Sequence, residues 1–102
     1  ELTRLRGALS NRCRTAFYQK GMKKDSGVRK LLGADLDIVK KHIEDQFIDG
    51  MSWDNWGADG WHIDHIIPLV SAKNKKELSV LCHYTNLQPL WAFDNLSKGG
   101  KH

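Results

Sequence analysis

Trp61-His62-Ile63-Asp64-His65-Ile66-Ile67-Pro68 is the stretch of sequence that decides the fold. Gly60 and Pro68 bound it, and its β-branched and aromatic residues predict an extended strand rather than a helix. Residues 85–90 predict a second extended segment, in which Pro89 indicates a sheet edge or a strand end. Residues 91–98 predict a short helix after it, and Gly99 is a suitable C-terminal stop.

The chain before this stretch is predicted to be mostly helical. Apolar residues recur at intervals of three and four over residues 2–20, which is the pattern of an amphipathic helix. Ser26 is the expected cap of a short helical turn that Gly33 closes. Asp35 is the expected cap of a further helix that ends near Gly50.

The remaining segments complete one α+β domain. Residues 49–60 are rich in Gly, Asp, Asn and Trp and predict a loop, and residues 75–82 predict another short helix. A length of 102 residues fits a single domain, since domains have about 100–200 residues. We therefore expect a basic helical N-terminal region over residues 1–57, belonging to the same domain as a core over residues 58–102.

The composition excludes several classes of protein. Hydrophobic residues make up 40% of the chain and charged residues 27%, an ordinary globular mixture that differs from disordered and collagenous sequences. No apolar run approaches the roughly 20 residues of a membrane span, so we expect no membrane partner. Cys13 and Cys82 lie far apart without a CxxC motif, which argues against a zinc ribbon or a disulfide scaffold. Reduced thiols fit a cytoplasmic location, which for a phage-encoded protein is the cytoplasm of the host cell.

The net charge of +4 is unevenly distributed along the chain. Residues 1–30 contain nine basic and two acidic residues, a charge of +7, whereas residues 31–102 contain seven basic and ten acidic residues, a charge of −3. A basic segment joined to a mildly acidic one is typical of a protein that holds phosphates with one part and uses carboxylates in the other. Nucleic acid is the natural partner of such a charge pattern, and a solvated helix face is the alternative for the charge run alone. For the chain as a whole the expected partner is double-stranded DNA.

The motifs of residues 61–98 resemble those of the HNH endonucleases, the ββα-metal nuclease family, in the phage-type variant with asparagine at the last motif position. The resemblance rests on the Asp-His-Ile-x-Pro run at 64–68, the Asn-Leu-Gln-Pro-Leu-Trp run at 86–91 and the nine-residue step from Asn86 to Asn95. Similar upstream residues extend it to about two-thirds of the chain. It implies a ββα-metal core, a two-stranded antiparallel hairpin with a long connection and a helix, preceded by N-terminal helices.

The same residues suit phosphodiester hydrolysis, which needs a base for the attacking water, a cation for the developing charge and groups that fix the geometry. His65 is the candidate base, because an imidazole titrates near neutral pH. Asp64 and Asn95 offer hard oxygen ligands, which favour Mg²⁺, with Mn²⁺ as a substitute, over zinc. The resemblance implies that Asn86 is not a ligand but braces the connection between the strands and orients His65.

Candidate DNA contacts are the basic residues of the first helix, one histidine and two C-terminal lysines: Arg4, Arg6, Arg12, Arg14, Lys20, His83, Lys98 and Lys101. For His83, a DNA contact and a role in pinning its loop are equally good interpretations. Trp91, Asn95 and Lys98 are expected on one face of the last helix. The four tryptophans are expected to form core rather than to stack on bases. Strand alternation sends Asp64 and His65 to opposite faces, so either the strand ends there or the site wraps its edge.

These observations predict a metal-dependent DNA endonuclease that nicks one strand. Two alternatives stay open: a catalytically silent DNA-binding or regulatory module on the same scaffold, and a toxin-type nuclease. A homodimer or a larger phage assembly also stays open.

Overall fold

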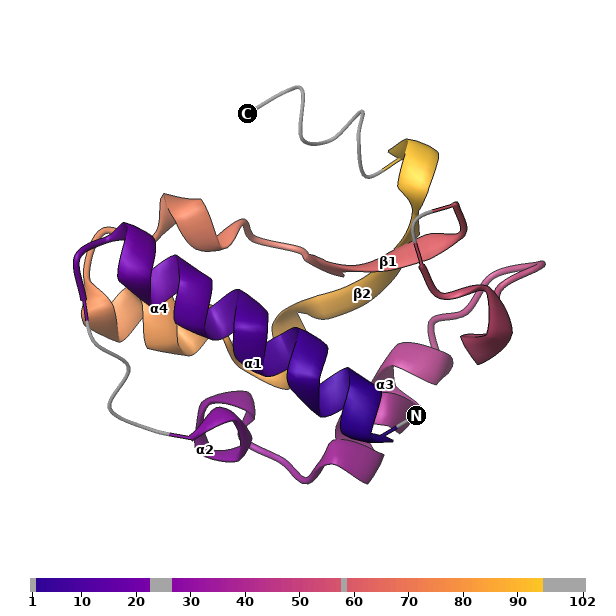
Figure 1. Ribbon diagram of the computed structural model, residues 1–102, viewed down its shortest axis with the longest axis horizontal. Coiled ribbons are helices and arrows are strands. Elements are labelled where there is room, and N and C mark those ends of the chain that lie inside the picture. The colour runs from indigo at the N-terminus through magenta and orange to yellow at the C-terminus, as the bar shows by residue number, and fades with distance from the viewer. Residues whose placement is uncertain (1, 23–26, 58, 95–102) are drawn as a thin grey trace.

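The computed structural model describes residues 2–22, 27–57 and 59–94 of the chain. It combines helices with a two-stranded antiparallel sheet, which confirms the α+β fold class. The elements are α1 (Leu2–Gln19), α2 (Val28–Leu32), α3 (Leu36–Glu44), β1 (Trp61–His65), α4 (Lys75–Leu81) and β2 (Leu87–Trp91), with 3₁₀ turns η1 (Trp53–Asn55), η2 (Leu69–Ser71) and η3 (Tyr84–Asn86). Figure 1 shows α1 lying across one face of the molecule, with α4 beside one half of it and α3 beside the other.

α1 forms the helix that the apolar periodicity predicts. Leu5, Leu9, Cys13 and Phe17 recur every four residues, and each is only 1% exposed. Leu5 and Leu9 pack in a cluster with α3 and both strands, whereas Cys13 and Phe17 pack in a second cluster with α4. α1 is therefore the element that joins two separate parts of the core.

The boundaries of α2 and α3 differ from the prediction. Gly27 takes the N-cap position of α2, and Ser26 lies outside the described residues. Asp35 stands at the N-cap of α3 as predicted, but its carboxylate pairs with Arg29 instead of bonding the helix. α3 ends at Glu44, six residues before Gly50. Just beyond this end, the side-chain amide of Gln46 donates to the carbonyls of His42 and Leu87 and so ties the chain to β2.

The two strands pair in one register, with Ile63 opposite Pro89 and Asp64 opposite Gln88. The Ile66 amide donates to the Asn86 carbonyl, so alternation along the ladder makes Ile63 and Pro89 a pair that exchanges no backbone hydrogen bond. The missing N–H of Pro89 therefore removes no backbone hydrogen bond between the strands, which explains how a proline stands in the middle of β2.

The strand ends differ from the prediction by two residues. β1 ends at His65 rather than Ile67, and β2 begins at Leu87 because the preceding residues form η3. Trp91 is the last residue of β2, so the expectation that it begins the last helix is wrong; residues 92–94 are helical. Asn95 and Lys98, expected on the same helix face, lie outside the described residues.

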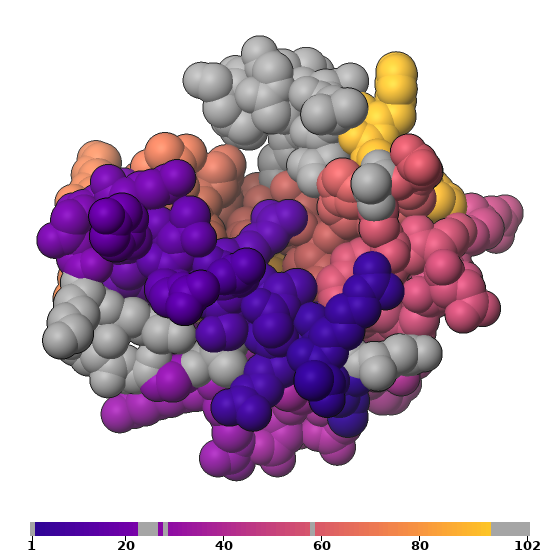
Figure 2. Space-filling view, in the orientation of Figure 1, coloured from indigo at the N-terminus to yellow at the C-terminus, as the bar shows by residue number. Residues whose placement is uncertain are grey.

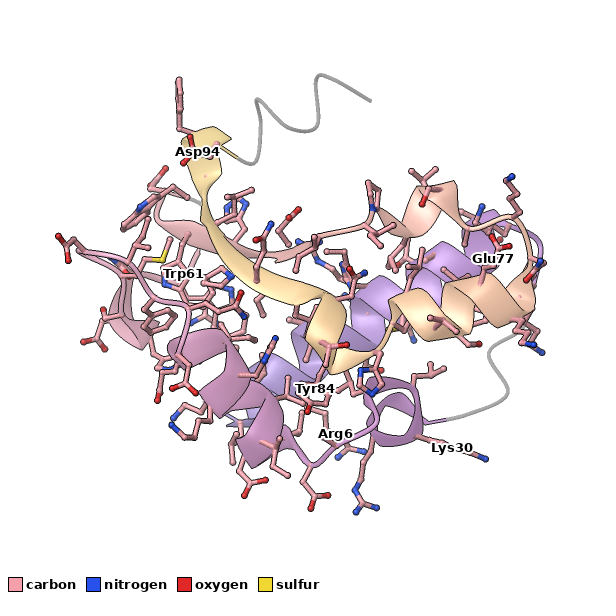
Figure 3. The ribbon with its side chains drawn as sticks, turned by 180° about the vertical axis from the view of Figure 1, so that it is seen from behind. Arg6, Lys30, Trp61, Glu77, Tyr84 and Asp94 are labelled. Carbon is pink, nitrogen blue, oxygen red and sulfur yellow. The ribbon has the colours of Figure 1, made fainter. Side chains whose placement is uncertain are left out.

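The tryptophans form core, as predicted. Trp61 is fully buried, and Trp53, Trp56 and Trp91 pack against the same cluster. Figure 3 shows Trp61 where the strands meet α3, and its indole N–H donates to the Ser52 carbonyl at 2.6 Å. This contact holds the loop before β1 against the sheet.

Among the described residues, no helix is both long and apolar enough to cross a membrane.

Candidate functional site

Asp64 lies on the face of the sheet opposite the core. Its cross-strand neighbour is Gln88, and the side-chain amide of Gln88 donates to Asp64 Oδ2 at 2.8 Å. The Asp64 residue is only 7% exposed. β1 therefore holds a mostly buried carboxylate beside a neutral amide, in a fixed direction.

His65 is the last residue of β1 and is 6% exposed. It stands opposite Leu87, which belongs to the core, so His65 and Asp64 point to opposite faces of β1. The strand ends at this residue, and Ile66 and Ile67 beyond it are 46% and 52% exposed. The chain thus reaches the surface directly after His65, while the Asp64 and His65 residues themselves are mostly buried.

Asn86 ties this strand end to two other segments. Its Oδ1 accepts from the Ile67 amide at 2.9 Å, and its Nδ2 donates to the Ile67 carbonyl at 3.0 Å. The same Nδ2 donates to the carbonyl of Leu81, the last residue of α4, at 2.8 Å. With its backbone paired to Ile66, Asn86 fixes the two residues that follow His65.

The described part of the chain contains no group of three or more His, Cys, Asp and Glu side chains that could hold a metal ion. Asp64 alone of the two predicted ligands is described, and Asn95, the other, lies outside the described residues with Lys98 and Lys101. Mg²⁺ binds hard oxygen donors such as a carboxylate, and water completes the coordination shell of the ion. Asp64 offers such a carboxylate, buried beside a neutral amide. The donor chemistry at Asp64 fits such an ion.

The cations of α1 separate onto two sides of the helix. A helix turns by about 100° per residue, so residues just before and just after a buried residue lie on opposite flanks. Arg4 and Arg12 directly precede members of the buried stripe, whereas Arg6 and Arg14 directly follow members of it. Lys20, the first residue after α1, comes next in the row of Arg4 and Arg12. Figure 3 shows Arg6 on the side of α1 that faces α2.

The first row faces the sheet and its connection to α4. The Arg4 guanidinium lies 4.1 Å from the Trp56 ring centre and donates to the Trp56 carbonyl at 2.7 Å. Lys20 Nζ donates to the Val70 carbonyl at 3.2 Å. Arg12 lines the space between these two contacts. We refer to Arg4, Arg12 and Lys20 as the inner row.

His83 has a structural place at the start of η3. Its Nδ1 lies 2.9 Å from Thr85 Oγ1 and accepts from the Thr85 amide. Its ring also packs against Gly33, where a Cβ would lie 2.5 Å from His83 Nε2. His83 therefore pins the loop before β2, and the prediction that it contacts DNA stays a prediction.

Gln88 is the site residue that sequence reasoning missed. It belongs to the Asn-Leu-Gln run, but nothing in the sequence alone pairs it with Asp64. Only the strand register places the two side chains opposite each other.

Comparison with known proteins gives two viral relatives. An uncharacterized protein of Acanthamoeba polyphaga mimivirus (L426) is 40% identical over 72 residues, which make up 69% of this chain and 31% of the relative. A second uncharacterized protein of the same virus (L246) is 34% identical over 76 residues, again 69% of this chain and 31% of the relative. The matched segment thus spans less than a third of either relative. No family model and no solved structure matches the chain.

Proposed function

We propose that this chain is a metal-dependent DNA endonuclease of the HNH type, built on a ββα-metal core, that nicks one strand of double-stranded DNA. The observation that supports this most directly is the corner where Asp64 and His65 end β1 and Asn86 clamps the residues that follow. The predicted base, a predicted ligand and the predicted bracing amide thereby fall within one small part of the fold.

In this proposal His65 is the general base. Its imidazole takes a proton from water as the water oxygen attacks phosphorus, and the bond from phosphorus to the 3′ oxygen breaks. The leaving 3′ oxygen takes a proton from solvent water, so the products are a 5′-phosphate and a 3′-hydroxyl. Since His65 ends β1, the scissile phosphate would approach from the strand end.

The other residues of the corner orient rather than react. Asn86 holds the chain after His65 and so limits the positions that the imidazole can take. Gln88 fixes the Asp64 carboxylate through Oδ2. Asp64, together with Asn95, would hold a single Mg²⁺, which supplies positive charge for the developing charge on phosphate oxygens. Mn²⁺ would substitute for it.

DNA as the substrate is supported by the charge of α1. The helix contains four arginines and no acidic residue. The ion pairs found among the described residues, Arg29–Asp35 and Lys41–Asp45, involve none of them. A helix with uncompensated positive charge beside the candidate site is suited to polyanions.

Incubation of supercoiled plasmid with Mg²⁺ tests the function. We expect the parent to produce open circles and EDTA to stop the reaction. His65→Ala should slow nicking by about 10²–10⁴-fold through loss of the base. Asp64→Ala should raise the Mg²⁺ concentration needed for the half-maximal rate.

His42→Ala is the matched control. It removes the same ring from α3, where His42 lies edge-on against Tyr84, outside the corner. Nicking at the parental rate by His65→Ala would contradict the assignment of the base. A parent that binds duplex DNA but leaves plasmid intact would favour the silent DNA-binding module instead.

A further inference from the structure

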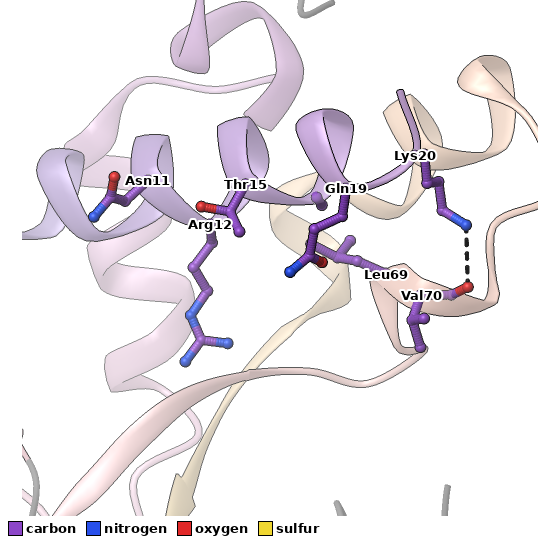
Figure 4. A pocket seen from close by; sticks show the side chains of 8 residues that line it. Asn11, Arg12, Thr15, Gln19, Lys20, Leu69 and Val70 are labelled. Atoms are coloured by element: carbon purple, nitrogen blue, oxygen red, sulfur yellow. Dashed lines mark hydrogen bonds between the residues drawn. The ribbon is translucent and has the colours of Figure 1, made fainter. Parts of the chain in front are cut away.

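A groove runs along α1 on the side of the inner row. One section has a volume of about 470 Å³ and lies between α1 and η2 (Figure 4). A second section of about 250 Å³ continues toward the loop before β1. Arg12 lines both sections, so its side chain lies between them. In Figure 2 the surface is hollowed between the purple atoms of α1 and the pink to orange atoms of β1 and its connection.

The lining of the groove suits an anion. Of the described residues that line the two sections, none is acidic. Asn11, Thr15 and Gln19 add neutral polar side chains on the α1 wall, and Leu69 and Val70 form an apolar opposite wall. Arg12 makes no hydrogen bond or ion pair with any described residue, and Figure 4 shows its guanidinium extending away from α1. Its five N–H donors therefore lack a protein acceptor among the described residues.

A positively charged side chain lies at each end of the groove. Arg4 is held against Trp56, and Lys20 is held by the Val70 carbonyl, both through neutral partners that leave the positive charge in place. The inner row spans about 24 Å along the helix at 1.5 Å per residue. That is the rise of about seven nucleotides of one DNA strand.

The groove also leads to the candidate site. His62 lines its second section, and strand alternation puts His62 on the same face of β1 as Asp64. A backbone lying in the groove would therefore pass the strand face that bears the predicted ligand.

We propose that this groove holds the phosphate backbone of one strand of the DNA duplex, with Arg12 as its central phosphate contact, and that Arg6 and Arg14 lie outside the interface. The inference rests on the proposed function and refines it: it names the flank of α1 that meets DNA and the path of the strand toward the corner.

Binding of a fluorescein-labelled 24-base-pair duplex in EDTA tests this without cleavage. Anisotropy titrations at about 50 to 200 mM KCl give the affinity and its salt slope, and each phosphate contact contributes about 0.9 to that slope. Arg12→Gln should lower the slope by about one and weaken binding about five- to tenfold at 0.1 M salt. Arg6→Gln removes the same charge from the flank that faces α2 and should leave the slope unchanged.

A second pair of variants tests the opposite wall. Val70 is 75% exposed on η2 and Val80 is 64% exposed on α4, outside the groove. Val70→Asp puts a carboxylate where the backbone would lie and should weaken binding about fivefold. Val80→Asp adds the same charge elsewhere and should have a clearly smaller effect.

Equal effects within either pair, or no duplex binding by the parent, would overturn the inference. If the parent nicks plasmid but the two variants of a pair have equal effects on binding, the endonuclease would be supported and DNA binding in the groove would be contradicted. If the two variants of each pair differ in binding but the parent does not nick plasmid, DNA binding in the groove would be supported and the endonuclease would be contradicted.

Discussion

Asn86 shows how much one side chain can determine at the residue scale. Its amide joins the end of β1 to the end of α4 through three hydrogen bonds, all to backbone groups. Asn86→Ala should lower the free energy of unfolding by about 2–3 kcal/mol, because each lost bond costs roughly 0.5–1.5 kcal/mol and strands a backbone partner. Urea denaturation measures it. Asn11→Ala, which removes an acceptor for exposed Arg14, should change stability by about 0.5 kcal/mol or less, and a similar loss in both variants would contradict the bracing role.

Gly33 and His83 form a second residue-scale dependence. Gly33 has a φ of +79°, which disfavours any side chain, and its missing Cβ leaves room for the His83 ring. Gly33→Ala should destabilise the protein by at least about 1 kcal/mol from the backbone alone, with further cost from the displaced ring. In a His83→Ala background the same substitution should cost less. A double-mutant cycle measures the coupling, and additive effects would show that the ring does not meet the new methyl group.

At the scale of elements, local patterns predicted well what local forces determine. The extent of α1 follows from its apolar spacing, and α4 begins after Asn74, whose side chain accepts from the Glu77 amide. The end of α3 could not be predicted, because Gln46 bonds a carbonyl of β2, 41 residues away in the sequence. Long-range contacts of this kind leave no periodic signal in the chain.

The candidate site divides in the same way. Asp64, His65 and Asn86 were found from short motifs, and the structure brings them to one strand end. Gln88 and the separation of the inner row from Arg6 and Arg14 depend on which faces pack together. Strand register and helix rotation set those faces, and a charge count along the sequence contains neither.

α1 should make the two core clusters unfold together. All four tryptophans lie in or against the first cluster, whereas Leu78, at 0% exposed, belongs to the second. Leu78→Ala should destabilise the protein by about 2–5 kcal/mol, as buried leucine truncations do. If α1 couples the clusters, tryptophan fluorescence and far-UV circular dichroism should report the same lowered midpoint. A fluorescence midpoint that stays parental while the dichroism midpoint falls would show that the clusters unfold independently.

At the scale of the whole molecule, the described chain offers one Asp64–His65–Asn86 corner and one groove that leads to it. On the proposed function a single corner would act on a single phosphate, so we expect a protein that works as a monomer to cut one strand per encounter. Supercoiled plasmid should then convert to open circles first, at a rate proportional to protein concentration, and linear DNA should follow only as second nicks accumulate opposite earlier ones. Time courses at several protein concentrations, resolved on agarose gels, measure both quantities. Linear DNA that appears together with open circles, at a rate rising with the square of protein concentration, would instead require two copies of the corner acting together on one duplex.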